Sequence, residues 1–200
     1  MIQSRWFGSA IFSLILCLAV PAFSQRGAIT APVSLDQMSR RADRIVHGSV
    51  VSARVEPHPQ LTNLSTIVIT MQVQDMLKGK AATTLTFRQF IWDLRDKQDA
   101  ARYLKGQELL LFLNPVSEYG LTSPVGLEQG RFRITRDRTG KAYAANGRDN
   151  AGLFSGTEQR ARAQHMKLST KATTVVQQAN PGPIPLDDMK QTIRELARMQ

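Results

Sequence analysis

The sequence predicts a small, mainly β domain that folds as an antiparallel barrel of five to seven strands, with a short helix before the strands and another helix after them. Short runs rich in β-branched and aromatic residues recur between residues 44 and 144. Turn signals containing Gly, Pro, Asn or Asp separate these runs. No long helical pattern lies between them, and closure into a barrel would remove the exposed edges of the sheet.

The first 25 residues have the three parts of a secretory signal peptide. Arg5 supplies the positive charge, residues 10–20 form the apolar stretch, and Pro21 is followed by small residues at the expected cleavage site. We expect cleavage rather than a membrane anchor, because a spanning helix needs roughly 20 apolar residues. Cys17 is the single cysteine and leaves with this leader, so the released domain is predicted to be cysteine-free. The expected location is periplasmic or extracellular, without a membrane span.

A short helix is predicted over residues 34–42, at the start of the domain. Leu35, Met38 and Ala42 fall on one face at spacings of three and four. Ser34 can cap the N-terminus of this helix.

The strands follow in order along the chain. The run 44–55 is rich in β-branched residues, and Gly48 within it predicts a bulge. In the run 67–74 the residues at every second position are apolar, which predicts a strand with one buried face. Further strands are predicted over residues 83–90, 108–113, 119–125, 130–135 and 142–144.

The predicted barrel domain covers residues 26–154. Residues 155–184 are polar and basic, and we interpret them as a mostly flexible linker with a weak helix around 157–167. Residues 185–200 form an amphipathic C-terminal helix with one apolar stripe: Leu186, Met189, Ile193 and Leu196. This helix either packs back on the sheet or binds a partner.

Several segments resemble known proteins. Three of them are similar in order and spacing to netrin-like domains, the oligonucleotide/oligosaccharide-binding-type barrels shared with tissue inhibitors of metalloproteinases: residues 42–52 (ADRIVHGSVVS), 73–79 (VQDMLKG) and 106–113 (GQELLLFL). A fourth, residues 126–132 (GLEQGRF), resembles a pattern in uncharacterised exported bacterial proteins. The resemblance implies a small barrel. The inhibitors act through an N-terminal cysteine, and the released domain would have none, so the resemblance implies a fold and not that mechanism.

No motif in the sequence predicts a cofactor or a metal ion. The three histidines lie in unrelated segments and no pair has the spacing of a helical zinc site: His47, His58 and His165. The chain also lacks the Gly-x-Ser-x-Gly elbow of a serine nucleophile. We therefore predict no catalytic residues and no metal ligands.

An enzymatic alternative depends on carboxylates in the polar stretch 92–103. Asp93, Asp96 and Asp99 are close enough in sequence for acid–base work in a small secreted hydrolase. Their neighbours are oppositely charged residues, which is also typical of a solvated surface.

The charge balance favours an anionic partner. The chain has 26 Lys and Arg against 16 Asp and Glu, a formal net charge of +10. Such an excess attracts anions over a long range, although it also keeps a protein soluble. Nucleic acid is not the expected ligand, because export separates the protein from it. A salt-sensitive polyanion-binding domain is a further alternative.

The leading hypothesis is a non-enzymatic exported domain that binds another exported protein. The predicted contact surface combines aromatic and basic residues near two strands: Phe90, Trp92, Arg95, Arg131 and Arg133. Phe90 and Trp92 are out of phase with the predicted core residues, and Arg131 and Arg133 alternate with Phe132 and Ile134.

Overall fold

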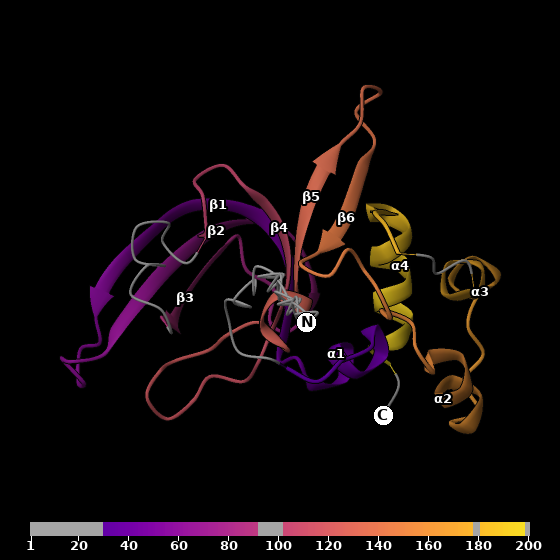
Figure 1. The fold of residues 1–200 in the computed structure, drawn as a ribbon, viewed down its shortest axis with the longest axis horizontal. Coiled ribbons are helices and arrows are strands. Elements are labelled where there is room, and N and C mark those ends of the chain that lie inside the picture. Colours follow the sequence, from indigo (N-terminus) through magenta and orange to yellow (C-terminus); the bar gives the residue numbers. More distant parts are fainter. Residues whose placement is uncertain (1–29, 92–101, 178–180, 199–200) are drawn as a thin grey trace, which may run out of the picture.

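The computed structural model describes residues 30–91, 102–177 and 181–198. These residues form one antiparallel sheet with the strand order β3-β2-β1-β4-β5-β6-β7 and several helices (Figure 1). The predicted mainly β fold, its N-terminal helix and its C-terminal helix are confirmed. The predicted signal peptide lies outside the described residues. Among the described helices, none has both the length and the apolar character needed to cross a membrane.

The elements differ strongly in length. In chain order they are α1 (Leu35–Arg41), β1 (Arg44–Pro57), β2 (Ser65–Lys78), β3 (Thr84–Phe90), β4 (Glu108–Leu113), the 3-10 helix η3 (Leu127–Gln129), β5 (Arg131–Arg136), β6 (Ala142–Asn146), α2 (Thr157–Ala163), α3 (Thr170–Gln177), β7 (Ile184–Pro185) and α4 (Leu186–Leu196).

The sheet is open, so the predicted closure into a barrel is wrong. β3 and β7 are the two ends of the strand order and do not pair with each other. Closure requires the first and last strands to form a ladder, but β7 has two residues and continues directly into α4. The β5–β6 hairpin also projects away from the rest of the sheet (Figure 1).

A glycine shapes the long β1–β2 pair. The register shifts between His47 and Gly48, which is the bulge that the sequence predicts. A Cβ atom on Gly48 would lie 2.2 Å from the Gln72 carbonyl oxygen, so the two backbones approach too closely there for any other residue.

Apolar residues pack on both faces of the sheet. On β4, Leu110 and Phe112 belong to one cluster, whereas Leu109 and Leu111 belong to another, because successive side chains point to opposite faces. We call the first cluster the helix-side core, since the buried faces of α1 and α4 contribute to it. The second is the far-side core, in which β1, β2 and β3 pack with Tyr103.

The predicted linker 155–184 instead contains two packed helices, α2 and α3. Thr157 and Ala161 of α2 are buried, and so are Ala172 and Val176 of α3. Each pair is four residues apart and lies on one helical face. The segment has few large apolar residues, which is why we expected a mostly flexible linker. These few nevertheless reach the helix-side core: Val176 is buried in it, and Met166, Leu168 and Val175 pack against it.

The C-terminal helix packs on the sheet, as one of the two sequence-based alternatives predicts. All four residues of its apolar stripe are buried in the helix-side core, and α4 contacts α1, β2 and β6. The predicted strand over 119–125 is absent from the described residues there, where two isolated bridges, at Leu121 and Pro124, replace it.

Candidate functional site

The β5–β6 hairpin, residues 131–146, is the most basic projecting element of the described chain, and we call it the basic hairpin. Its single acidic residue, Asp137, stabilises the turn. The Asp137 carboxylate accepts hydrogen bonds from the Thr139 hydroxyl at 2.6 Å, the Thr139 amide at 2.8 Å and the Lys141 amide at 3.0 Å. Hydrogen bonding by the Thr139 hydroxyl is the main cause of a lowered pKa at Asp137. The turn is therefore held rigid at neutral pH.

Arg136, the last residue of β5 before the turn, ties this end of the strand to the sheet. Its guanidinium donates to both oxygens of Glu108 on β4, at 3.0 and 2.9 Å. The same carboxylate accepts a hydrogen bond from Nε2 of His47 on β1 at 2.8 Å. A bidentate arginine–carboxylate pair fixes orientation as well as distance. This positive charge is thus engaged within the protein.

Arg131 is a second cation that the fold engages internally. It is buried, its guanidinium lies 5.0 Å from the centre of the Tyr103 ring, and it is 3.1 Å from the Glu128 carboxylate. Burial raises the pKa of Tyr103 to about 12, against the opposing effect of Arg131, so Tyr103 is neutral. The alternation of residues 130–135 predicts an outward Arg131. Both faces of β5 are covered at this position, so that prediction is wrong.

Three cations of the basic hairpin remain exposed with no acidic partner among the described residues: Arg133, Arg138 and Lys141. Phe132 and Ile134 pack in the helix-side core, so Arg133 points to the opposite face of β5. Tyr143, which pairs with Thr135, is on that same face, and Lys141 Nζ lies 5.5 Å from the centre of its ring. The result is a half-buried tyrosine flanked by cations on a rigid, projecting support.

The structure describes only part of the predicted contact surface. Phe90 is half-buried at the end of β3, and Arg133 is exposed. Arg131 is buried, while Trp92 and Arg95 lie outside the described residues, as do the three aspartates of the hydrolase hypothesis. Arg133 is not at a sheet edge, because β5 pairs with β4 on one side and β6 on the other.

Sequence reasoning missed the contribution of Tyr143 and Lys141. The signal was the short basic turn 136–141 between two strands, which brings β6 back beside β5. The return strand was predicted, but its outward face was not considered together with that of β5.

A second polar cluster lies beside His47 on the α4 side of the sheet. Asp75 of β2 pairs with Lys190 at 3.2 Å and with Arg194 at 2.6 Å, both from α4. Burial and then the charge of Lys190 lower the pKa of His47 from the ordinary 6.5, although the Glu108 hydrogen bond opposes this. A neutral His47 therefore donates from Nε2 to Glu108, while its buried Nδ1 has no hydrogen-bond partner.

His58 lies between two prolines, and its imidazole makes hydrogen bonds within the protein. Its Nδ1 accepts from the backbone amides of Gln60 and Leu61 at 3.2 and 3.0 Å, and its Nε2 donates to the Tyr119 carbonyl at 2.7 Å. Every polar atom of this imidazole is satisfied when the proton is on Nε2. His58 thus connects two loops. Among the described residues, no group of three or more His, Cys, Asp or Glu side chains is placed to hold a metal ion.

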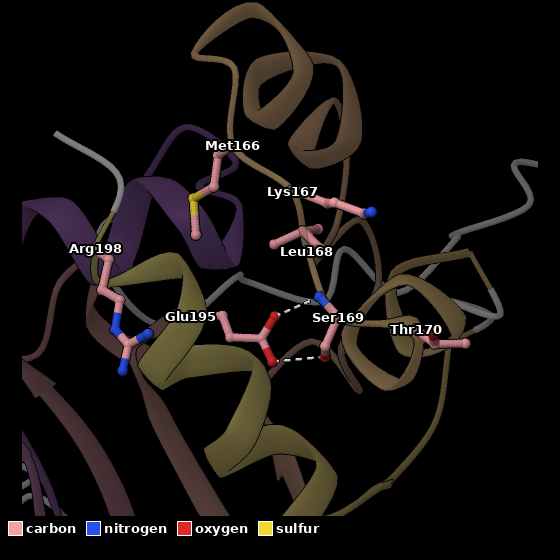
Figure 2. A pocket seen from close by; sticks show the side chains of 7 residues that line it. All are labelled: Met166, Lys167, Leu168, Ser169, Thr170, Glu195 and Arg198. Carbon is pink, nitrogen blue, oxygen red and sulfur yellow. Dashed lines mark hydrogen bonds between the residues drawn. The ribbon is translucent and has the colours of Figure 1, made fainter.

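An open groove of about 560 Å³ lies between α4 and the segment 166–170 (Figure 2). Its main acidic group, Glu195, accepts hydrogen bonds from the Ser169 amide at 2.8 Å and hydroxyl at 2.6 Å. These bonds satisfy the start of α3 in the manner of a helix cap. The groove is therefore a junction between helices whose polar groups already bind each other.

Asp36 is the most deeply buried charge of the described chain. Its carboxylate accepts from Arg160 Nε at 2.6 Å, from Thr157 at 2.8 Å and from Ser34 at 2.7 Å. Burial raises the pKa of Asp36, but these hydrogen bonds and the Arg160 charge outweigh burial and lower it to about 2. The cluster joins α1 to α2, so it serves folding rather than binding.

Comparisons with known proteins identify no relative. No family model, no curated protein and no solved structure matches this chain.

Proposed function

We propose that this protein is an exported, non-enzymatic binding domain that recognises an acidic surface of another exported protein through the basic hairpin. The observation that carries the proposal is the set of three exposed cations on the hairpin that also carries Tyr143. Two other cations of the same hairpin are engaged by Glu108 and Glu128, but these three have no acidic partner in the described chain.

The chemistry of this surface suits a protein partner. Tyrosine and arginine are the residue types most enriched at the energetic centres of interfaces. Cations at such a surface speed the encounter with an acidic partner and select against basic ones. Because Asp137 holds the turn and Arg136 ties the adjoining end of β5 to Glu108 of β4, little conformational entropy is lost when the hairpin binds.

The predicted export supports the same proposal. The leader pattern of residues 1–25 favours a partner in the periplasm or outside the cell.

A crosslinking pull-down tests the proposal. The protein is incubated with the exported fraction of its own host at low and high salt, and captured proteins are identified by mass spectrometry. The test variant neutralises the hairpin cations: R133Q, R138Q and K141Q. The matched control removes the same charge from exposed positions elsewhere: R41Q, K80Q and K167Q.

We expect one acidic protein to be captured by the wild type and the control, and a roughly ten- to hundredfold weaker capture by the hairpin variant. Equal loss in both variants would show that only the overall charge matters. Capture of anionic polymers alone, abolished by salt, would replace the protein partner with a polyanion.

A further inference from the structure

Over about half of β1, no strand in the described part of the chain pairs with one of its sides. β4 pairs with β1 only over Arg44–Ser49, and the backbone of residues 106–107 continues this contact to Val50. On its other side β1 pairs with β2 as far as Pro57. From residue 51 to 57, no strand of the described chain covers the outer edge. We call this segment the β1 edge.

The hydrogen-bonding phase shows which groups the β1 edge presents. The His58 amide donates to the Leu64 carbonyl, so residue 58 faces β2. In an antiparallel pair, backbone groups alternate between the partner and the opposite side. Residues 56, 54 and 52 therefore also bond to β2, whereas the N–H and C=O groups of Ala53 and Val55 point away from it. Within the described residues these groups have no backbone partner.

The side chains protect the β1 edge only in part, because exposed valines lie among Arg54, Glu56 and Pro57. Val51 and Val55 are 44% and 37% exposed, which makes them two of the few exposed large apolar residues of the described chain. An unpaired edge with exposed valines is a template for another strand unless charges or prolines prevent it. Pro57 ends the edge but does not interrupt it.

The charges of the β1 edge are self-complementary. Arg54 and Glu56 flank Val55 and face one side of the sheet, where they lie 3.4 Å apart. If two copies pair antiparallel about a two-fold axis at Val55, each Arg54 is directly opposite Glu56 of the other copy. The two Val55 residues then exchange both backbone hydrogen bonds, and each Ala53 amide can donate to the second lone pair of the Pro57 carbonyl opposite. Arg88 of β3 already donates to that carbonyl at 3.4 Å and to the Glu56 carboxylate at 3.3 Å within its own copy. A register centred on Ala53 puts Arg54 opposite Ser52 and lacks this charge match.

We propose that two copies of this protein associate through the β1 edge, in the register centred on Val55, and so extend the sheet across a two-fold axis. The contact is short because Pro57 and Pro59 stop the ladder, so it is a weak, reversible dimer. The basic hairpin is on other strands and takes no part in it, so this inference is independent of the proposed function.

The test is sedimentation velocity of the purified protein over a range of roughly 1 μM to 1 mM. Two variants each place like charges opposite one another: Arg54→Glu and Glu56→Arg. We expect each alone to dimerise about ten- to hundredfold more weakly than the wild type. Mixed in equal amounts, the two variants should form heterodimers, because the two acidic side chains of one copy then lie opposite the two basic side chains of the other.

Proline substitutions supply a second, independent measurement. Val55→Pro removes an outward N–H without breaking a bond to β2, and we expect it to abolish the dimer. Thr86→Pro is the matched control on β3, the other edge of the sheet, and we expect it to leave the dimer intact. Circular dichroism verifies that each variant is folded. A wild type that is monomeric throughout, or single and mixed charge variants that dimerise equally well, would overturn the proposal.

Discussion

The Asp36 cluster and the basic hairpin use charge in opposite ways. At the Asp36 cluster a fully buried carboxylate has several donors, drawn from segments more than 100 residues apart in sequence. At the basic hairpin, Arg133, Arg138 and Lys141 are exposed and have no acidic partner among the described residues. A buried charge without partners is strongly destabilising, whereas an exposed one is not. Charge at the first site therefore maintains the fold, and charge at the second is available for binding.

The environment of Glu108 is intermediate between the Asp36 cluster and the exposed cations. It is mostly buried, yet it contacts both the exposed Arg136 at the turn end of β5 and the buried His47 on β1. The comparison predicts a graded series of effects on stability, from the buried cluster through Glu108 to the exposed cations.

The largest effect is expected from Asp36→Ala. This change leaves Arg160 and the Thr157 hydroxyl without their shared acceptor, so we expect a loss of about 3 kcal/mol in the free energy of unfolding. Urea denaturation measures it. Asp137→Ala, in the exposed turn, is the control and should lower the free energy of unfolding far less, because solvent screens that carboxylate. A similar loss of unfolding free energy in both variants would contradict the expected difference between buried and exposed carboxylates.

The contribution of the Asp36 cluster to the free energy of unfolding should decrease at acid pH. The pKa of Asp36 is lowered from 3.8 to about 2 in the folded state. The ionised carboxylate therefore contributes about 2 kcal/mol above pH 4, and this contribution is lost as the pH falls from about 4 to 2. The difference in unfolding free energy between the wild type and Asp36→Asn, measured at each pH, should shrink over that range. A difference that stays constant from pH 6 to 2 would contradict the lowered pKa.

Removal of Glu108 should have an intermediate effect. Glu108→Ala leaves Nε2 of His47 buried without an acceptor and releases Arg136, so we expect a loss of about 1–2 kcal/mol. Hydrogen exchange should also accelerate in the basic hairpin, because the turn end of β5 is no longer tied to β4. Exchange that accelerates equally in α2 and α3 would indicate general destabilisation instead.

The smallest effect on stability is expected at the exposed cations. Neutralising Arg133, Arg138 and Lys141 should change the free energy of unfolding by no more than about 0.5 kcal/mol, since the described chain offers them no ion pair to lose. Thermal unfolding monitored by circular dichroism is sufficient. A stability loss near that of Glu108→Ala would mean that these cations support the fold.

Features that depend on a single element were predicted from the sequence, whereas features that depend on contacts between distant segments were not. Local periodicity correctly predicted the buried face of β2 and the apolar stripe of α4, because each is a pattern within one element. It failed at Arg131, which alternation places outward, because Tyr103 and Glu128 come from other segments. It predicted a weak helix around residues 157–167, where α2 lies, but not the packing of α2, which depends on the long-range pair of Asp36 and Arg160 and on the small side chain of Ala161. Contacts between distant segments leave no local pattern.

The candidate site was likewise predicted only where a single strand determines it. Arg133 was predicted from the alternation within β5, whereas its grouping with Tyr143 and Lys141 depends on the register between β5 and β6. The open sheet was missed for a related reason. Strand-forming runs predict strands, but they do not show whether the last strand reaches the first.

The most direct test of the binding account is hydrogen–deuterium exchange of the protein with and without its captured partner. We expect the partner to slow exchange at residues 131–146, centred on the exposed cations, and to leave exchange unchanged around Asp36 and in α2 and α3. Protection at those helices or at the groove beside Glu195, with an unchanged basic hairpin, would contradict it.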